Sequence, residues 1–278
     1  MLVATLDGNR LEAENAERGL AYTCPKCERS VILKRGRIKI AHFAHKPPTD
    51  CTWAKGETLA HLEAKKLFKD AFVSRGLRAE VEFIVPSLPN DRRADVMVWS
   101  PSGTRIAIEL QHTNIGIEEI EARSFSYARE DIAQAWIPFL RPSVWEDAEI
   151  RTGGDGAGKM LIEKYPARPF ERWAHAFHLG RLWFFNPAGG TLWRGHFDDH
   201  EIWVEESSWY VEGGEEVSAG GFSRTSRRWK ELTLWGPYAF HQVKIKVDHR
   251  KRWQTSRYKV PAGRVAQLVA EDEHGETP

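Results

Sequence analysis

Two acidic residues on either side of a short turn are the strongest chemical signal in this chain. Asp95 opens an apolar run, Val96–Trp99. Glu109 follows a second apolar run, Ile106–Ile108, after a turn rich in serine, proline and glycine. Adjacent strands joined in this way bring both carboxylates to one end of a hairpin, where they can share a divalent cation. Magnesium takes oxygens from one or two carboxylates and water or phosphate for the rest, so the predicted magnesium ligands are Asp95, Glu109 and the Leu110 carbonyl.

An ordinary β-hairpin with two acidic residues near its open end is the alternative interpretation. Two features favour a site instead. Asp95 and Glu109 both lie in apolar strand contexts, where an unpaired charge is costly. Gln111 is two residues after Glu109, so strand alternation points both side chains to one face of the sheet. A metal held there would activate water for phosphodiester hydrolysis, and Gln111 is predicted to orient that water.

A predicted helix at residues 57–75 precedes the hairpin and adds a third group of candidates. Its composition is rich in alanine and leucine and poor in β-branched residues. Glu57, His61 and Lys65 are spaced i, i+4 and i+8, which places them on one stripe. The stripe is either a solvated surface or an extension of the site, with Glu57 beside the metal and His61 and Lys65 toward the scissile phosphate. Lys65 would then supply the positive charge that Gln111 lacks.

All three cysteines lie in the first 51 residues. Cys24 and Cys27 form a C-x2-C pair, and Cys51 follows a segment that contains His42 and His45. Three thiolates and one imidazole fill a tetrahedral zinc site and leave no open position, so the predicted zinc is structural. A redox C-x-x-C pair is the alternative, which is disfavoured because no long apolar strand leads into Cys24. Of the two histidines, His45 is the predicted ligand.

The motifs of residues 20–140 follow one another in a specific order. They are Tyr22–Cys27, Arg35-Gly36, His42–Lys46, Cys51, Gly56-Glu57 with His61 and Lys65, Arg93–Asp95, Glu109–Gln111, Arg123 with Tyr127, and Ala135–Ile137. In this combination they resemble the CoiA-like competence protein family. The resemblance implies an N-terminal zinc-binding module fused to a restriction-endonuclease-like core of the PD-(D/E)xK type, with Gln111 in place of the usual lysine. It also implies a role in processing DNA taken up in natural transformation, with active-site positions at Asp95, Glu109, Gln111, Glu57 and His61.

The chain of 278 residues has room for two domains, or for one domain and a small module. The predicted division is a zinc-binding module at 1–52, a nuclease core at 53–141 and a β-rich, tryptophan-rich domain at 142–278. An α+β core in the order αβββαβ is predicted from the helix at 57–75, a strand at 79–85, a hairpin at 94–110, a helix at 117–129 and a strand at 133–140. Beyond the core, short strands are predicted at 182–185, 191–193, 201–205, 232–235 and 242–247.

Composition indicates a globular, cytoplasmic protein. Hydrophobic residues make up 41% of the chain and charged residues 28%. Asp7 interrupts the N-terminal apolar run, and no uncharged run approaches membrane-spanning length, so neither a signal peptide nor a membrane span is expected. Few cysteines with metal-ligand spacing fit a reducing compartment. A Gly-rich segment at 153–159 is predicted to be a loop, and the residues from Glu271 onward a disordered acidic tail.

Charge is unevenly distributed, although the net charge is only +1. Residues 198–216 hold eight Asp or Glu and no Lys or Arg, whereas residues 224–264 hold twelve Lys or Arg against two acidic residues. The basic segment also contains several aromatic residues, a combination that suits phosphate contacts and base stacking. The alternative is that the two segments pair within one β-rich domain. The predicted nucleic-acid-binding residues are Arg123, Arg227, Arg228, Arg250, Lys251 and Arg252.

These features predict a metal-dependent nuclease that acts on DNA, with structural zinc and catalytic magnesium or manganese. The alternative is a DNA-binding accessory protein in transformation or recombination, whose nuclease core has lost catalysis together with its lysine. An endonuclease of mobile-element or phage conflict is a third interpretation, because the C-terminal half is unfamiliar and offers a surface for a protein partner. The choice between DNA and RNA, the strandedness of the substrate, the mode of cutting and the oligomeric state stay open.

Overall fold

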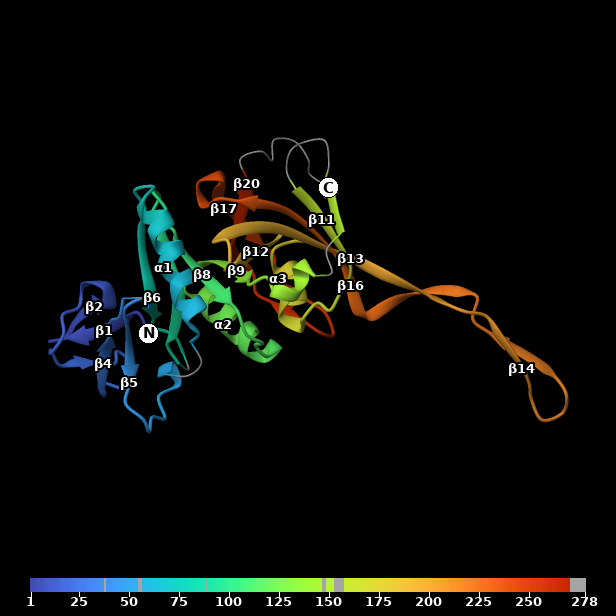
Figure 1. Cartoon of the computed structure of the whole chain (residues 1–278), viewed down its shortest axis with the longest axis horizontal. Coiled ribbons are helices and arrows are strands. Elements are labelled where there is room, and N and C mark those ends of the chain that lie inside the picture. The colour runs from blue at the N-terminus through green and yellow to red at the C-terminus, as the bar shows by residue number, and fades with distance from the viewer. Residues whose placement is uncertain (38, 55–56, 89, 147–148, 153–157, 271–278) are drawn as a thin grey trace.

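Figure 1 shows the chain as a computed structural model, which describes residues 1–37, 39–54, 57–88, 90–146, 149–152 and 158–270. Gly56, residues 153–157 of the predicted loop and the predicted tail from Glu271 lie outside these ranges. The described elements form a sheet-rich molecule with few helices. The longest helix, α1, has 15 residues, and no helix within the described ranges has the length and apolar character of a membrane span.

The N-terminal residues form a small antiparallel sheet with the strand order β2-β1-β3-β4-β5. Tyr22 and Phe43 pack against each other in its core, with ring centroids 4.9 Å apart. The core also contains Cys24 and Cys51. A core of this size rarely supports a fold without a metal, disulfides or another stabilising link. The five strands are β1 Val3–Leu6, β2 Asn9–Glu12, β3 Tyr22–Thr23, β4 Ser30–Lys34 and β5 His42–His45.

The central sheet has six strands in the order β17-β20-β9-β8-β7-β6. Alternation along β7 divides its side chains between two faces: Val96 packs in a cluster with Phe68 of α1, and Met97 in a cluster with Tyr127 of α2. The two helices therefore cover opposite faces. The chain order is the predicted αβββαβ, with α1 Leu59–Val73, β6 Arg78–Val85, β7 Arg92–Trp99, β8 Arg105–Gln111, α2 Ile117–Arg129 and β9 Ala133–Pro138.

Two strands of this sheet come from the C-terminal region. Strand β20, Gly263–Ala270, lies parallel to β9, and β17, Val243–Arg250, pairs antiparallel with β20. Every residue of β9 is buried, and a strand buried on both faces in the interior of a sheet needs a neighbour at each edge. The sheet thus extends past the predicted boundary at residue 141, because β8 covers only one edge of β9.

A second sheet has the strand order β10-β11-β16-β13-β12. One of its faces packs against helix α3, Pro169–Phe177, through Trp173 and Phe177. The separate strands predicted at 191–193 and 201–205 are parts of one 14-residue strand, β13, because the polar residues between them continue the pairing with β16. The strands are β10 Glu149–Thr152, β11 Gly158–Tyr165, β12 Leu182–Asn186, β13 Thr191–Val204 and β16 Phe222–Tyr238.

Strands β13 and β16 continue beyond this sheet as a two-stranded ribbon that projects from the body of the molecule (Figure 1). Strands β14, Ser207–Tyr210, and β15, Glu216–Ala219, form a hairpin at its far end. The remaining described elements are a short pair, β18 Trp253–Gln254 and β19 Lys259–Val260, and the 3-10 turns Ala13–Asn15, Thr52–Ala54, Pro142–Trp145 and Phe240–Gln242.

Candidate functional site

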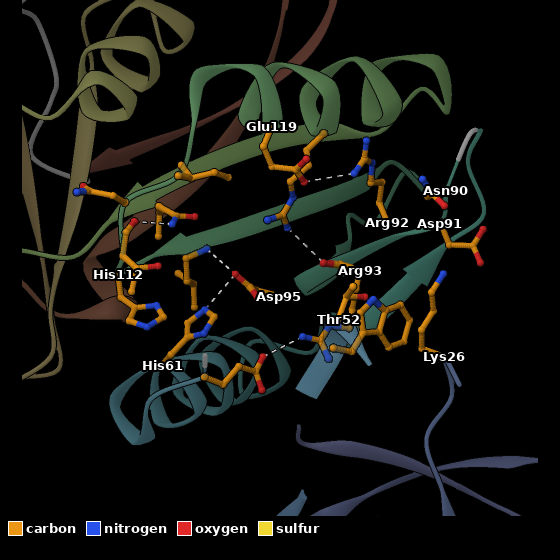
Figure 2. Close-up of a pocket in the computed structure, with 18 residues that line it drawn as sticks. Lys26, Thr52, His61, Asn90, Asp91, Arg92, Arg93, Asp95, His112 and Glu119 are labelled. Carbon is orange, nitrogen blue, oxygen red and sulfur yellow. Dashed lines mark hydrogen bonds and ion pairs between the residues drawn. The ribbon is translucent and has the colours of Figure 1, made fainter. Parts of the chain in front are cut away.

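A polar cavity of about 640 Å³ lies where α1, the strand ends of β7 and β8, α2 and the N-terminal module meet (Figure 2). The predicted site residues Glu57, His61, Asp95 and Gln111 line it. Four cations line it too: Lys26 from the turn between β3 and β4, Arg92 and Arg93 from β7, and Arg123 from α2. The fold therefore brings the helix stripe and the end of the hairpin together, and residues of the N-terminal module form a further wall of the cavity.

Asp95 lies at the floor of the cavity and is 8% exposed. His61 Nε2 lies 3.2 Å from its Oδ2, and the backbone N–H of Leu110 donates to the same oxygen over 2.9 Å. Lys65 Nζ lies 3.1 Å from Oδ1. Burial opposes ionisation, but Lys65 and His61 outweigh it and hold the pKa of Asp95 well below its usual value. The carboxylate is therefore charged at neutral pH.

Glu57 and His61 approach Asp95 from α1 and the residues just before it. Ligand atoms of all three side chains lie within 4.8 Å of one another, a spacing that one metal ion can bridge. The helix begins after Thr58, whose hydroxyl accepts a hydrogen bond from the His61 N–H over 3.3 Å. Since this cap fixes the first turn of α1, it also fixes where the His61 ring enters the cavity.

Lys65 has a different place from the one predicted for it. Its side chain has no exposed surface and forms ion pairs with Glu57, Glu82 and Asp95. Burial disfavours the ammonium, but the three carboxylates together raise the pKa of Lys65 above its usual value. Lys65 thus neutralises the carboxylates from beneath the cavity, whereas a side chain that reaches the scissile phosphate would need an open path to solvent.

Glu109 is 1% exposed and does not line the cavity. The hydroxyl of Tyr127 and the guanidinium of Arg123 both donate to its carboxylate. Burial raises the pKa of Glu109 to about 7, although Arg123 opposes the shift. At the cavity, the side chains whose spacing could hold a metal ion are therefore Asp95, Glu57 and His61, while Glu109 is held by α2.

Gln111 lines the cavity, and its side-chain amide donates to the Thr113 carbonyl over 2.6 Å. The next residue, His112, also lines the cavity and was not predicted. Its ring stacks on His61, with centroids 4.5 Å apart, and burial lowers its pKa to about 4. Alternation along β8 would turn His112 away from Gln111, but the strand ends at Gln111, so alternation gave no signal for it.

The four predicted zinc ligands form one cluster. Ligand atoms of Cys24, Cys27, His45 and Cys51 all lie within 4.8 Å of one another, and the three cysteines are free thiols. The Sγ atoms of Cys24 and Cys51 are 3.9 Å apart, close to the roughly 3.8 Å edge of a tetrahedron with 2.3 Å zinc–sulfur bonds. The donor set and its spacing therefore fit a closed zinc site.

The choice of histidine also follows from the geometry. His45 Nε2 lies 3.3 Å from Cys27 Sγ, whereas His42 Nδ1 lies 2.9 Å from the Ile40 carbonyl, outside the cluster. The backbone N–H of Arg29 and the His45 ring outweigh burial and lower the pKa of Cys27 to about 6. A thiolate is the form that binds zinc.

Residues next to the cysteine–histidine cluster in the sequence also line the cavity. Lys26 lies next to Cys27, and Thr52 and Trp53 follow Cys51; all three line the cavity. The Lys26 ammonium lies 5.8 Å and the Arg93 guanidinium 4.9 Å from the centroid of the Trp53 ring. The N-terminal module therefore forms one wall of the cavity.

The other predicted nucleic-acid-binding residues lie away from the cavity. Arg227 and Arg228 are exposed on β16, while Arg250 donates to the carbonyls of Ala176 and Phe177 and so supports α3. The acidic and basic segments do pair in part, through the ion pair between Asp199 and Lys230. Lys251 and Arg252 are exposed.

Comparison with family models agrees with this architecture. The model of the competence protein CoiA N-terminal domain matches residues 6–54, and the model of the CoiA nuclease-like domain matches residues 57–141. Residues 6–141, just under half of the chain, belong to the CoiA-like competence protein family. The CoiA nuclease-like domain spans α1 to β9, including the cavity floor. Searches of curated proteins and of solved structures found no match.

Proposed function

We propose that this CoiA-like protein is a metal-dependent nuclease that hydrolyses phosphodiester bonds in DNA. One observation carries the proposal: Glu57, His61 and Asp95 converge at the floor of a cavity within a nuclease-like domain. Lys26, Arg92 and Arg123 on its walls suit contact with the phosphates of a nucleic acid. The αβββαβ order supports a restriction-endonuclease-like core as part of the same proposal.

Magnesium or manganese would be held by Asp95, with Glu57 and His61 or with Glu109 and the Leu110 carbonyl as the remaining protein ligands. Carboxylates suit both ions, and an imidazole suits manganese better than magnesium. When bound, the ion supplies a Lewis acid and an activated water. Gln111 would orient that water from the cavity wall, and Arg123 would bind phosphate once it is released from Glu109.

The accessory-protein interpretation is favoured by a different observation. The buried network combines four carboxylates with three side-chain cations: Glu57, Glu82, Asp95, Glu109, Lys65, Arg93 and Arg123. A site whose carboxylates are already neutralised attracts a divalent ion less strongly than an open acidic pair. In this second proposal the cavity binds nucleic acid without cutting it.

Cleavage assays on the full chain separate the two proposals. Wild-type protein with magnesium or manganese should cut plasmid, linear or single-stranded DNA. Asp95→Asn should lower the rate by more than the roughly 100-fold that loss of an outer-shell partner costs, with DNA affinity retained. Gln111→Ala should be milder, and Gln111→Lys should be tolerated. Glu163→Gln, on the exposed side of β11, is the matched control.

Manganese binding then distinguishes the two ligand sets. If Glu57 and His61 are ligands, Glu57→Gln should weaken manganese affinity and Glu109→Gln should not. The opposite result assigns the ion to Asp95 and Glu109. Absence of cleavage of DNA and RNA by wild-type protein, together with unchanged DNA binding in Asp95→Asn, would replace the nuclease by the accessory binder.

A further inference from the structure

The projecting ribbon is an unusual surface for a protein that stands alone. We call residues 198–230 the arm. Residues 201–222 are its tip, and residues 198–200 and 223–230 are its base. Five of the twelve large apolar side chains exposed in the described part of the chain lie on the tip: Trp203, Trp209, Tyr210, Val211 and Phe222. Clustered exposed aromatic residues are typical of surfaces that another molecule covers.

The arm also lacks neighbours along both of its edges. Strand β12 pairs with β13 only as far as Gly195, and β11 pairs with β16 only from Lys230 onward. Among the described strands, those of the tip pair only with each other. An isolated two-stranded ribbon is marginally stable in water, and free strand edges are templates for further pairing.

Charge along the arm changes sign between tip and base. The tip contains six glutamates and no Lys, Arg or His. The base contains Arg224, Arg227 and Arg228, all exposed, and among the described residues no carboxylate forms an ion pair with any of them. Lys230 is paired with Asp199. An acidic end and a basic end on one elongated surface make that surface complementary to an antiparallel copy of itself.

The direction of the tip is set by the backbone. Gly220 has φ +110°, and a Cβ at this position would lie 2.0 Å from the Glu205 carbonyl oxygen. Only glycine fits this close approach, which lets the chain bend where β13 ends and β14 begins. The bend therefore keeps Glu205, Glu206 and the aromatic residues of the tip at a defined place relative to the base.

We propose that two copies of this chain associate through their arms, antiparallel and about a twofold axis. The acidic tip of each arm lies along Arg224, Arg227 and Arg228 of its partner, and the tip aromatics become buried between the ribbons. Such a contact is isologous, since the same surface acts on both chains. It is independent of the nuclease proposal, because no arm residue lines the cavity.

The mass of the full chain in solution tests this arrangement. Wild-type protein should sediment as two chains rather than the 31.8 kDa of one, with dissociation on dilution and at high salt, where charge pairs are screened. A tip variant, Glu205→Lys with Glu206→Lys, and a base variant, Arg227→Glu with Arg228→Glu, should each be monomeric. Lys251→Glu with Arg252→Glu, an exposed basic pair outside the arm, should leave the dimer unchanged.

Mixing the two variants provides the decisive measurement. In the mixed dimer the lysines of the tip variant meet the glutamates of the base variant, and the second contact is wild-type, so a heterodimer should form from two monomeric variants. This rescue also shows that neither variant has a misfolded arm. The proposal is overturned if wild-type protein is monomeric at all concentrations, if either variant still dimerises, or if the mixture stays monomeric.

Discussion

The cavity and the arm use charge in opposite ways. Around the cavity, buried carboxylates and cations pair with one another inside a single chain, as Lys65 does with three acids. On the arm, six glutamates and three arginines remain exposed to solvent beside aromatic side chains. The comparison indicates that the cavity network is stabilised by the fold itself, whereas the arm depends on a surface supplied by another molecule.

Among changes near the cavity, loss of the predicted zinc should destabilise the fold most. His45→Ala should lose bound zinc and unfold residues 1–54, because apparent zinc-binding free energies in small modules are about 10–16 kcal/mol and the module core is small. Hydrogen exchange should show lost protection in the N-terminal sheet and retained protection in β13 and β16. His42→Gln, whose ring lies outside the cluster, should retain one zinc per chain. Freshly purified wild-type protein without zinc would contradict the prediction.

Breaking the charge network should have the next largest effect. Lys65→Met leaves three buried carboxylates without their shared cation, and removal of one partner from a buried pair costs about 3–5 kcal/mol. Urea unfolding at pH 7 measures the loss. Lys66→Met removes the neighbouring, partly exposed lysine that pairs with Glu14 and Asp70 and should cost less than about 1 kcal/mol. Equal losses in the two variants would mean that the cavity network is not specially coupled.

Acid should weaken the contact between strand β9 of the central sheet and the C-terminal end of helix α3. Burial lowers the pKa of His178 to about 3, and its Nε2 accepts a hydrogen bond from the Trp136 N–H over 3.0 Å. The unfolded chain binds this proton below about pH 6.5, so the folded state loses roughly 2 kcal/mol between pH 6.5 and 5. Stability against pH should be flatter in His178→Gln. The exposed His241→Gln should keep the wild-type slope.

Removal of a tryptophan from the arm should have the smallest effect on the free energy of unfolding. Trp209→Ala lies on the exposed tip and should change the free energy of unfolding of the body by less than about 0.5 kcal/mol. Trp173→Ala, fully buried against Trp136 and Phe177, should cost about 3–5 kcal/mol. Thermal melting of both variants under dilute, monomeric conditions tests the contrast. A comparable loss for Trp209→Ala would mean that the arm already packs within its own chain.

Local patterns were sufficient for the order of elements in the core. Alternation and helical spacing predicted α1, the hairpin and α2 close to their observed bounds, because each pattern lies within a few turns of chain. The pairing of β9 with β20 joins residues some 130 apart, and nothing local encodes it. The length of β13 was missed for a related reason, since its polar middle is stabilised by cross-strand pairing with β16.

The site was predictable to a similar extent. C-x2-C spacing predicted the cluster of three cysteines and His45. Helical spacing placed His61 and Lys65 on the face of α1 that meets Asp95, whereas Glu57 reaches the cavity from the residues before the helix. The capture of Glu109 by Arg123 and Tyr127 depends on how α2 packs on the sheet, which the spacing of two helix residues does not reveal. His112 was missed because it lies one residue past the end of β8.

The late position of β20 has a consequence for synthesis of the chain. During translation, the nuclease-like segment up to residue 141 emerges with one edge of β9 uncovered, and that edge stays open until residues 263–270 leave the ribosome. An apolar strand edge exposed for this interval is a site where nascent chains associate wrongly. Completion of the central sheet therefore comes after the last strand of the second sheet, β16, has been made, so a chain that is released early lacks the finished scaffold of the cavity.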